Sequence, residues 1–251
     1  MCVAFFFDIP TIRVAHDYKS RIMAKKNFII QLFDDIAPTY DKLNHLLSMN
    51  IDKQWRKKAV RTICQKHPET ALDIACGTGD FAIALAQAGI PHVTGIDISE
   101  GMLEVGRKKV AALGLNIEMK VDDSEQLSMA DGSVDAISAA FGVRNFEHLQ
   151  KGLEEMHRVL RNDGFVCILE LSVPQNPMLC WIYKLYFMHV LPFFGGLISG
   201  NRSAYEYLPN SVLNFPKPDK FCSMLSDAGF KQVKSRSLTF GLCRMFTGVK
   251  E

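Results

Sequence analysis

Two closely spaced glycines, with acidic residues around them, are the part of this sequence best suited to hold a cofactor. Gly77 and Gly79 follow the apolar run 71–75, where a strand is expected to end and a helix to begin. Glycines in such a turn let the backbone bend tightly and approach a ligand closely. Asp97 ends the next apolar run, where a carboxylate can accept both hydroxyls of a ribose. The pattern indicates a nucleotide-type site.

The charge of the neighbouring residues favours one cofactor class over another. Gly77, Gly79 and Ala82 also satisfy the Gly-x-Gly-x-x-Ala pattern of dinucleotide-binding proteins. Asp73, however, suits the positively charged amino acid end of S-adenosylmethionine (SAM), whereas a dinucleotide site must hold an anionic pyrophosphate. We therefore predict a SAM site and keep a dinucleotide-dependent oxidoreductase as the alternative. The predicted contacts are Asp73, Gly77, Gly79, Asp97 and, after a third apolar run, Asp123 and Ser124.

Apolar runs alternate with helical patterns between residues 70 and 173, which we interpret as the cofactor-binding core. The predicted strands are 71–75, 92–97, 117–121, 134–140 and 165–172. The predicted helices are 81–89, 99–113 with Ser99 as N-cap, and 148–160. This order predicts an α/β fold with a doubly wound, mostly parallel sheet that binds ligands at the carboxyl ends of its strands.

Segments on both sides of the core complete a single predicted domain, 23–251. Residues 24–66 predict a helical cap. Residues 174–216 are aromatic, apolar and rich in turn formers, and predict an inserted lid over the carboxyl edge of the sheet. Residues 217–251 predict a helix around 218–228 and two strands, 231–237 and 239–249, which make the sheet seven-stranded. Residues 1–22 lack a clear period and are predicted to be a disordered extension, with Met23 as an alternative start.

Composition and residue spacing exclude several classes of protein. The net charge is +2 and charged residues make up 22% of the chain, so there is no electrostatic case for nucleic acid as a partner. None of the seven cysteines forms a Cys-x-x-Cys pair, which favours reduced thiols in the cytoplasm. The histidines have no metal-ligand spacing, and we predict no metal. The apolar stretch 177–199 contains Lys184 and Pro192, so we do not expect it to span a membrane.

Six ordered blocks of sequence stand out along the chain. They are FDDIAPTYDKLNH (33–45), IDKQWR (51–56), GTGD (77–80), AFGVRN (140–145), SAYEYL (203–208) and FP (215–216). With these blocks, about residues 28 to 250 resemble the C-methyltransferases of ubiquinone and menaquinone biosynthesis, a family of SAM-dependent class I methyltransferases. Cys76 stands where many members have glycine, Ala140 where some have serine, and Ala204 is an extra residue.

The resemblance implies a reaction and a substrate class. It implies SAM contacts at Thr78, Asp97, Asp123 and Ser124. It implies a Rossmann-like fold and methylation of a ring carbon of a prenylated quinol, first of all demethylmenaquinol to menaquinol. The ubiquinone-pathway acceptor, 2-polyprenyl-6-methoxy-1,4-benzoquinol, is the alternative within the family. A quinone-binding module without catalysis is the alternative outside it, and a homodimer is left open.

Three residues are predicted to take part in catalysis. A phenol must lose its proton before its ortho carbon attacks the methyl group, so the site needs a base or a group that stabilises the anion. Arg144 is predicted to stabilise the phenolate or to orient a water that takes the proton, and Asn145 to anchor the other oxygen. The alternative for Arg144 is a salt bridge that holds the lid. Tyr40, with the neighbouring Asp41, is predicted to close over the donor methyl group, with helix capping as the alternative.

The aromatic part of the predicted lid suits an isoprenoid tail. Its side chains could line a groove for the tail, and exposed ones could dock on the inner face of the membrane that contains the quinone. The alternative is a plain lid core. The residues concerned are Trp181, Tyr183, Leu185, Tyr186, Phe187 and Met188.

Overall fold

A seven-stranded sheet is the centre of the molecule. The computed structural model describes residues 11–185 and 202–251. The strand order is β3-β2-β1-β4-β5-β7-β6. Pairs from β3 to β5 are parallel, and β7 is antiparallel to both neighbours, which confirms the predicted fold class. The strands are β1 (Thr70–Ile74), β2 (His92–Asp97), β3 (Ile117–Val121), β4 (Val134–Ala140), β5 (Leu160–Leu171), β6 (Lys231–Leu238) and β7 (Cys243–Val249).

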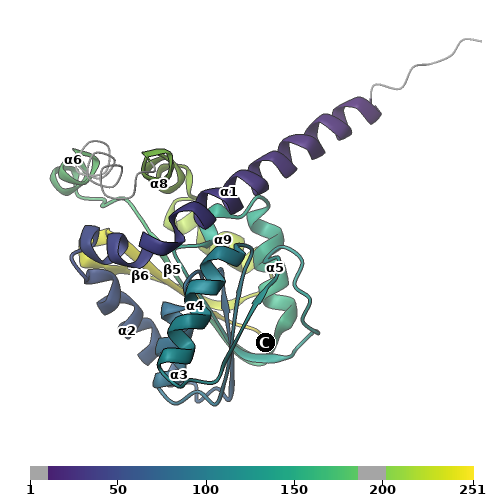
Figure 1. Ribbon diagram of the computed structural model, residues 1–251, viewed down its shortest axis with the longest axis vertical. Helices are drawn as coiled ribbons and strands as arrows, with labels where there is room; N and C mark the ends of the chain where they lie inside the picture. Colours follow the sequence, from purple (N-terminus) through teal and green to yellow (C-terminus); the bar gives the residue numbers. More distant parts are fainter. Residues whose placement is uncertain (1–10, 186–201) are drawn as a thin grey trace, which may run out of the picture.

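Helices cover both faces of the sheet (Figure 1). On one face α2 (Ile51–Cys64), α3 (Asp80–Gln87) and α4 (Glu100–Ala112) bury apolar side chains against the strands. On the other face α5 (Leu149–Val159) and α9 (Pro218–Asp227) do the same. Alternate residues of a strand point to opposite faces, so Leu72 and Ile74 face α5 and α9 while Ala71 faces α2 and α3. Asp73 therefore points to the same face as Ala71.

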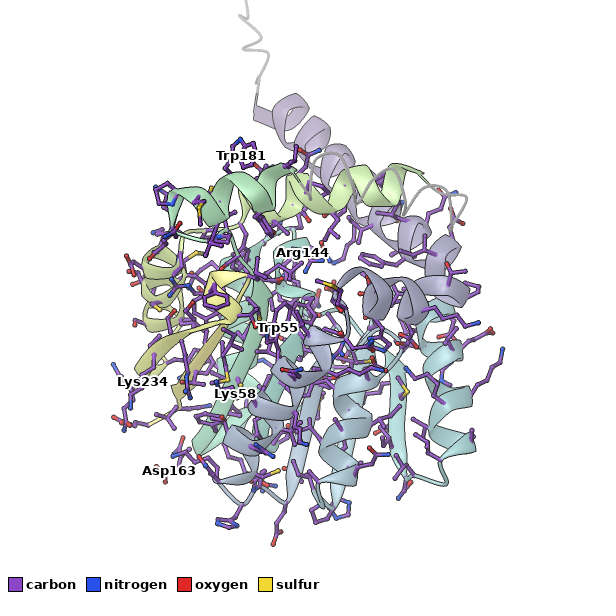
Figure 2. All side chains as sticks on the ribbon, turned by 90° about the vertical axis from the view of Figure 1, so that its left-hand side faces the viewer. Trp55, Lys58, Arg144, Asp163, Trp181 and Lys234 are labelled. Carbon is purple, nitrogen blue, oxygen red and sulfur yellow. The ribbon has the colours of Figure 1, made fainter. Side chains whose placement is uncertain are left out.

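The cap and the lid lie at the carboxyl edge of the parallel strands. The cap consists of α1 (Thr11–Leu47) and α2. In the lid segment the structure describes α6 (Pro177–Leu185) and α8 (Arg202–Asn214). Figure 2 shows these two helices as a band above the sheet, with Arg144 beneath them and Trp181 on the outside. Among the residues that the structure describes, no helix has the length and apolar character needed to cross a membrane.

Local chemistry explains where the core elements begin. The Ser99 hydroxyl accepts from the backbone N–H of Met102 at 3.2 Å, which confirms the predicted N-cap of α4. Gly77 and Gly79 have φ of +56° and +81°, a region that bulky residues rarely adopt. The turn between β1 and α3 therefore requires glycine, and it brings the backbone to the carboxyl edge of the sheet.

Three boundaries differ from the sequence prediction by more than two residues. Residues 11–22 are helical in α1 although disorder was predicted for 1–22; no glycine or proline interrupts residues 11–37, and residues 1–10 lie outside the described part. β5 begins at Leu160, not at 165, because the backbone N–H of Asp163 bonds to the carbonyl of Lys250 beside β7. Residues 239–241 form the 3₁₀ turn η3 (Thr239–Gly241) before β7, because Thr239 and Phe240 have positive φ.

Candidate active site

Three adjoining cavities lie at the carboxyl edge of the sheet. The first, here the acidic cavity, encloses about 760 Å³ including its open mouth. The second, the loop cavity, encloses about 370 Å³ beside the glycine turn. The third, the apolar cavity, encloses about 1440 Å³ under the cap and the lid. The predicted site residues are distributed over these three spaces.

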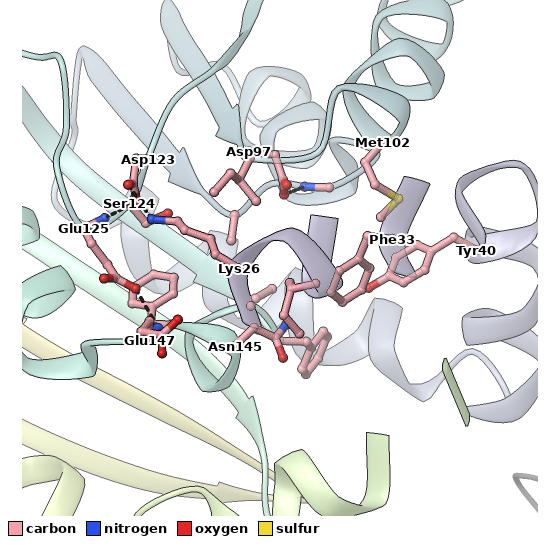
Figure 3. A pocket seen from close by; sticks show the side chains of 18 residues that line it. Lys26, Phe33, Tyr40, Asp97, Met102, Asp123, Ser124, Glu125, Asn145 and Glu147 are labelled. Carbon is pink, nitrogen blue, oxygen red and sulfur yellow. Dashed lines mark hydrogen bonds and ion pairs between the residues drawn. The ribbon is translucent and has the colours of Figure 1, made fainter. Parts of the chain in front are cut away.

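Asp97, Asp123 and Ser124 line the acidic cavity, as Figure 3 shows. The Asp97 carboxylate accepts from the backbone N–H of Gly77 at 2.8 Å and from that of Ser99 at 2.9 Å. Burial raises the pKa of Asp97, although these bonds oppose the rise. Asp123 accepts from the Lys26 ammonium at 2.5 Å. Burial would raise the pKa of Asp123, but the hydrogen bonds from Lys26 and from the backbone N–H of Glu125, with the charges of Lys26 and Lys151, together outweigh it and the pKa is lowered.

Asp73 lies beneath the glycine turn and is fully enclosed. Its carboxylate accepts from the Ser138 hydroxyl at 2.6 Å and from the backbone N–H of Ala82 at 3.1 Å. Burial raises its pKa to about 7. Asp73 lines the loop cavity, so it supports the turn and also borders the space in front of it.

The other members of the predicted turn have different surroundings. Gly77 lines both the acidic and the loop cavity. The Thr78 side chain is buried, and its hydroxyl donates to Asp41 at 2.6 Å. Gly79 is the N-cap of α3 and is absent from the walls of the three described cavities. A ligand in the loop cavity would therefore meet the backbone of Thr78 more readily than its hydroxyl.

An ionic network joins the cap to the glycine turn, and sequence reasoning missed it. Lys109 of α4 contacts Asp41 of α1 at 2.8 Å and Asp80 of α3 at 2.5 Å. Arg56 of α2 contacts Asp52 at 2.6 Å and Asp80 at 3.5 Å. One feature of the sequence could have indicated this network: the blocks 33–45, 51–56 and 77–80 each contain an aspartate. The network fixes the cap over the turn.

Arg144 lies in the wall of the apolar cavity and is paired with Glu170 of β5. Its Nη1 donates to Glu170 Oε1 at 2.7 Å, and the two side chains are 6% and 0% exposed. Nη1 also donates to the Phe141 carbonyl, and Nε to the Ser211 hydroxyl of α8 at 3.2 Å. Burial would lower the pKa of Arg144, but the Glu170 carboxylate, with smaller contributions from Tyr40 and Tyr207, outweighs it and the pKa is raised. Arg144 is thus a permanent cation that also holds the lid.

Glu170 is a residue that sequence reasoning missed. It is the acidic residue in the apolar run FVCILELS. A carboxylate inside a buried strand must be paired, and this was the signal that could have found it. Glu170 also accepts from the backbone N–H of Arg144 at 3.1 Å, so it fixes both the side chain and the backbone of that residue.

Asn145 and Tyr40 lie close to Arg144 but face different spaces. Asn145 lines the acidic cavity, not the apolar one, and its amide oxygen accepts from the Tyr207 hydroxyl at 3.1 Å. Tyr40 lines all three cavities. Burial raises its pKa although Arg144 opposes the rise. The phenol of Tyr40 therefore stays protonated at neutral pH.

The lid contributes only part of the aromatic groove that was predicted. Tyr183 and Leu179 of α6 line the apolar cavity. Trp181 and Leu185 are 66% and 48% exposed. Tyr186, Phe187 and Met188 lie outside the described residues. Much of the cavity wall instead comes from the cap and from η3, including Met49, Trp55 and Phe240.

The acidic cavity suits a positively charged ligand. Among the described residues, four acidic side chains and one lysine line it: Asp97, Asp123, Glu125, Glu147 and Lys26. A Cβ atom at Gly77 would lie 3.1 Å from the Met102 methyl group, and one at Gly79 would lie 2.9 Å from that of Met119. The turn is thus a close-fitting backbone cradle. The charge favours SAM over a pyrophosphate. In the described part of the chain, no group of three or more His, Cys, Asp or Glu side chains could hold a metal ion.

Comparison with known proteins identifies the family. The ubiE/COQ5 methyltransferase family matches residues 21–250 of this chain. The chain belongs to this family. The family confirms the resemblance seen in the sequence and the predicted SAM-dependent methyltransferase activity, and it excludes the dinucleotide-dependent oxidoreductase.

Curated relatives cover nearly the whole chain. Demethylmenaquinone methyltransferase of Bacteroides fragilis is 45% identical over 229 residues, which are 90% of this chain and 94% of the relative. The ubiquinone/menaquinone biosynthesis C-methyltransferase UbiE of Geotalea uraniireducens is 42% identical over 235 residues, which are 92% of this chain and 99% of the relative.

Solved structures share the fold at low sequence identity. A SAM-dependent methyltransferase from Thermotoga maritima has a TM-score of 0.60 at 17% identity, covering 88% of this chain and 99% of that one. One from Aquifex aeolicus has a TM-score of 0.51 at 21% identity, covering 72% and 82%. This member of the family therefore has the fold of SAM-dependent methyltransferases.

Proposed function

We propose that this protein transfers a methyl group from SAM to a ring carbon of demethylmenaquinol. The observation that carries the proposal is the adjoining pair of cavities, one acidic and one apolar, with Tyr40 in the wall of both. A cationic donor and a lipid acceptor need such different surroundings. The names of the curated relatives, demethylmenaquinone methyltransferase among them, support this acceptor.

SAM would occupy the acidic cavity and the loop cavity. Asp97 would accept from the ribose hydroxyls, and Asp123 with Ser124 would contact the adenine. Asp73, Gly77 and the Thr78 backbone would hold the amino acid end, and Gly79 would keep the turn in shape. When bound, SAM supplies an electrophilic methyl group.

The chain's own residues would prepare the acceptor ring. Arg144 stays cationic beside Glu170 and lines the apolar cavity, so it can stabilise the phenolate that activates the ortho carbon. Tyr40 stays protonated and can donate a hydrogen bond at the boundary of the two cavities. Asn145 faces the acidic cavity, so we propose that it supports the cofactor side through Tyr207. The cap and the described lid helices, α6 and α8, would exclude water.

The ubiquinone-pathway acceptor is the second candidate, because relatives such as the UbiE of Geotalea uraniireducens carry both pathways in their name. The test is transfer from methyl-labelled SAM to demethylmenaquinol and to 2-polyprenyl-6-methoxy-1,4-benzoquinol, side by side. We expect label on the naphthoquinol ring. Label in neither product contradicts the proposed function, and label in the benzoquinol alone contradicts the choice of acceptor. Acceptor binding without transfer would support the non-catalytic alternative.

We further propose that the mouth of the apolar cavity contacts the bilayer from which the acceptor comes. Met49 and Phe240 line the cavity and are 77% and 81% exposed. Each has a positive φ, 51° and 55°, a conformation that costs energy in bulky residues. Two strained turns thus present apolar side chains to solvent at one opening, which is typical of a lipid-binding surface.

Sedimentation with phosphatidylglycerol/phosphatidylethanolamine vesicles tests this contact. The double variant Met49→Ser/Phe240→Ser should bind vesicles at least tenfold more weakly than the native chain. Leu113→Ser is the matched control, since Leu113 is 52% exposed at the end of α4 and lines none of the described cavities. Equal vesicle binding by the double variant would contradict the proposed surface.

A further inference from the structure

Phe141 is the second residue at the boundary of the cavities, and sequence reasoning gave it no role. Among the described residues, only Tyr40 and Phe141 line the acidic, loop and apolar cavities together. Tyr40 comes from the cap, whereas Phe141 directly follows β4 in the core. The region where the donor and acceptor spaces meet is therefore lined by one aromatic ring from each part of the molecule.

The backbone of Phe141 is held in an unfavourable conformation. Its φ is +62°, in the left-handed region that a bulky residue avoids. Its N–H donates to the carbonyl of Leu169 at 2.8 Å, and its carbonyl accepts from Arg144. A Cβ atom at Gly142 would lie 2.5 Å from the Cβ of Ala75, so the next residue must be glycine. Backbone strain that the surroundings impose in this way is typical of functional positions.

Two cap residues fix the ring itself. The Trp55 ring meets it edge to face, with centroids 6.0 Å apart, and the Arg56 guanidinium lies 5.7 Å from its centroid. Trp55 is in turn anchored by a hydrogen bond from its Nε1 to the Thr239 hydroxyl at 2.8 Å. A ring restrained through both its backbone and its neighbours can act as a rigid spacer.

We propose that Phe141 is a positioning residue that sets the approach of the acceptor carbon to the donor methyl group. This inference rests on the proposed function. Methyl transfer needs near-attack alignment, and a misplacement of about 1 Å can cost about 10²-fold in rate. A planar, fixed ring keeps the two ligands in line, whereas a flexible aliphatic side chain of similar size does not. Phe141 thus affects the transfer step more than the binding of either ligand.

The variant Phe141→Leu tests the proposal, and Phe141→Met replaces it if the leucine variant does not fold. Calorimetry gives the dissociation constants of S-adenosylhomocysteine and of a short-tailed demethylmenaquinol, and single-turnover reactions give the transfer rate. We expect both dissociation constants within about threefold of the native values and transfer about 10²-fold slower. The control is Phe165→Leu, because Phe165 lies in the core and lines none of the three described cavities. It should change neither the dissociation constants nor the transfer rate.

Two outcomes overturn the inference. One is native transfer by the Phe141 variant. The other is a loss of binding as large as the loss of rate, which would make Phe141 an ordinary wall residue. If the native protein itself transfers no methyl group, the proposed function fails, and this result is distinct from either outcome.

Discussion

The acidic cavity and the apolar cavity adjoin, but they are built from different parts of the chain. Turns that follow β1 to β4 form most of the acidic cavity. The apolar cavity joins the cap, the lid and η3, from Tyr40 to Leu242. The first site therefore comes mostly from one part of the chain, residues 75–147, to which α1 adds four side chains from Lys26 to Tyr40. The second exists only after the cap, the lid and η3 have packed together. Because the two cavities have different walls, substitutions should separate donor binding, acceptor binding and stability.

Asp97→Ala should have the largest effect, and it should weaken donor binding without changing acceptor binding. It removes a carboxylate that accepts from Gly77 and Ser99 and that is proposed to bind the ribose. Hydrogen bonds to a charged group are worth about 1.5–3 kcal/mol each, so S-adenosylhomocysteine should bind at least about 10²-fold more weakly. Calorimetry measures this loss. Acceptor binding that falls equally would show that the two cavities are not separate.

Asp73 should make the core lose stability as pH rises. Its pKa of about 7 lies above the ordinary aspartate value of 3.8, so between these values the unfolded chain has released a proton that the folded protein still holds. Each pH unit in this window costs about 1.4 kcal/mol. Stability should fall between about pH 4 and pH 7, more in the native protein than in Asp73→Asn. Urea unfolding over this range measures it, and identical slopes for both proteins would contradict the buried carboxyl.

Glu170→Gln should damage the apolar side and leave the donor side intact. The variant leaves the buried Arg144 cation with a neutral partner, and breaking a buried pair costs about 3 kcal/mol or more. We expect lower stability in urea and slower transfer, with S-adenosylhomocysteine affinity unchanged. Glu155→Gln, which weakens the half-exposed pair with Arg158, is the control and should cost about 1 kcal/mol at most. Equal losses of stability and transfer rate in both variants would contradict the role proposed for Glu170.

Leu179→Ser should have the smallest effect, and it tests whether the lid side of the apolar cavity binds the isoprenoid tail. Leu179 lines the apolar cavity from the lid, and a buried apolar side chain contributes about 1.5–3 kcal/mol. We expect a long-tailed acceptor to bind about tenfold more weakly, while an acceptor with one isoprene unit loses less. The KM for each acceptor measures this. If the substitution raises the KM of both acceptors equally, the tail does not bind against Leu179.

The same contrast explains how much could be predicted from the sequence. The core strands, the glycine turn and the Ser99 cap depend on periodicity and local chemistry, so β2, β3 and β4 have the predicted bounds. Glu170, Phe141 and the network around Lys109 depend on which segments meet in space. No spacing along the chain reports that Arg144 meets both Glu170 and Ser211. The acceptor and its binding region could be predicted only through the resemblance to a known family.

The structure of a ternary complex with S-adenosylhomocysteine and a short-tailed demethylmenaquinol would show whether donor and acceptor occupy the two adjoining cavities. We expect the cofactor product in the acidic cavity, with its ribose on Asp97. We expect the naphthoquinol ring in the apolar cavity beside Arg144, with its reacting carbon facing the sulfur directly where Tyr40 and Phe141 line both cavities. A ring bound on the acidic side, or on another surface of the protein, would contradict this arrangement.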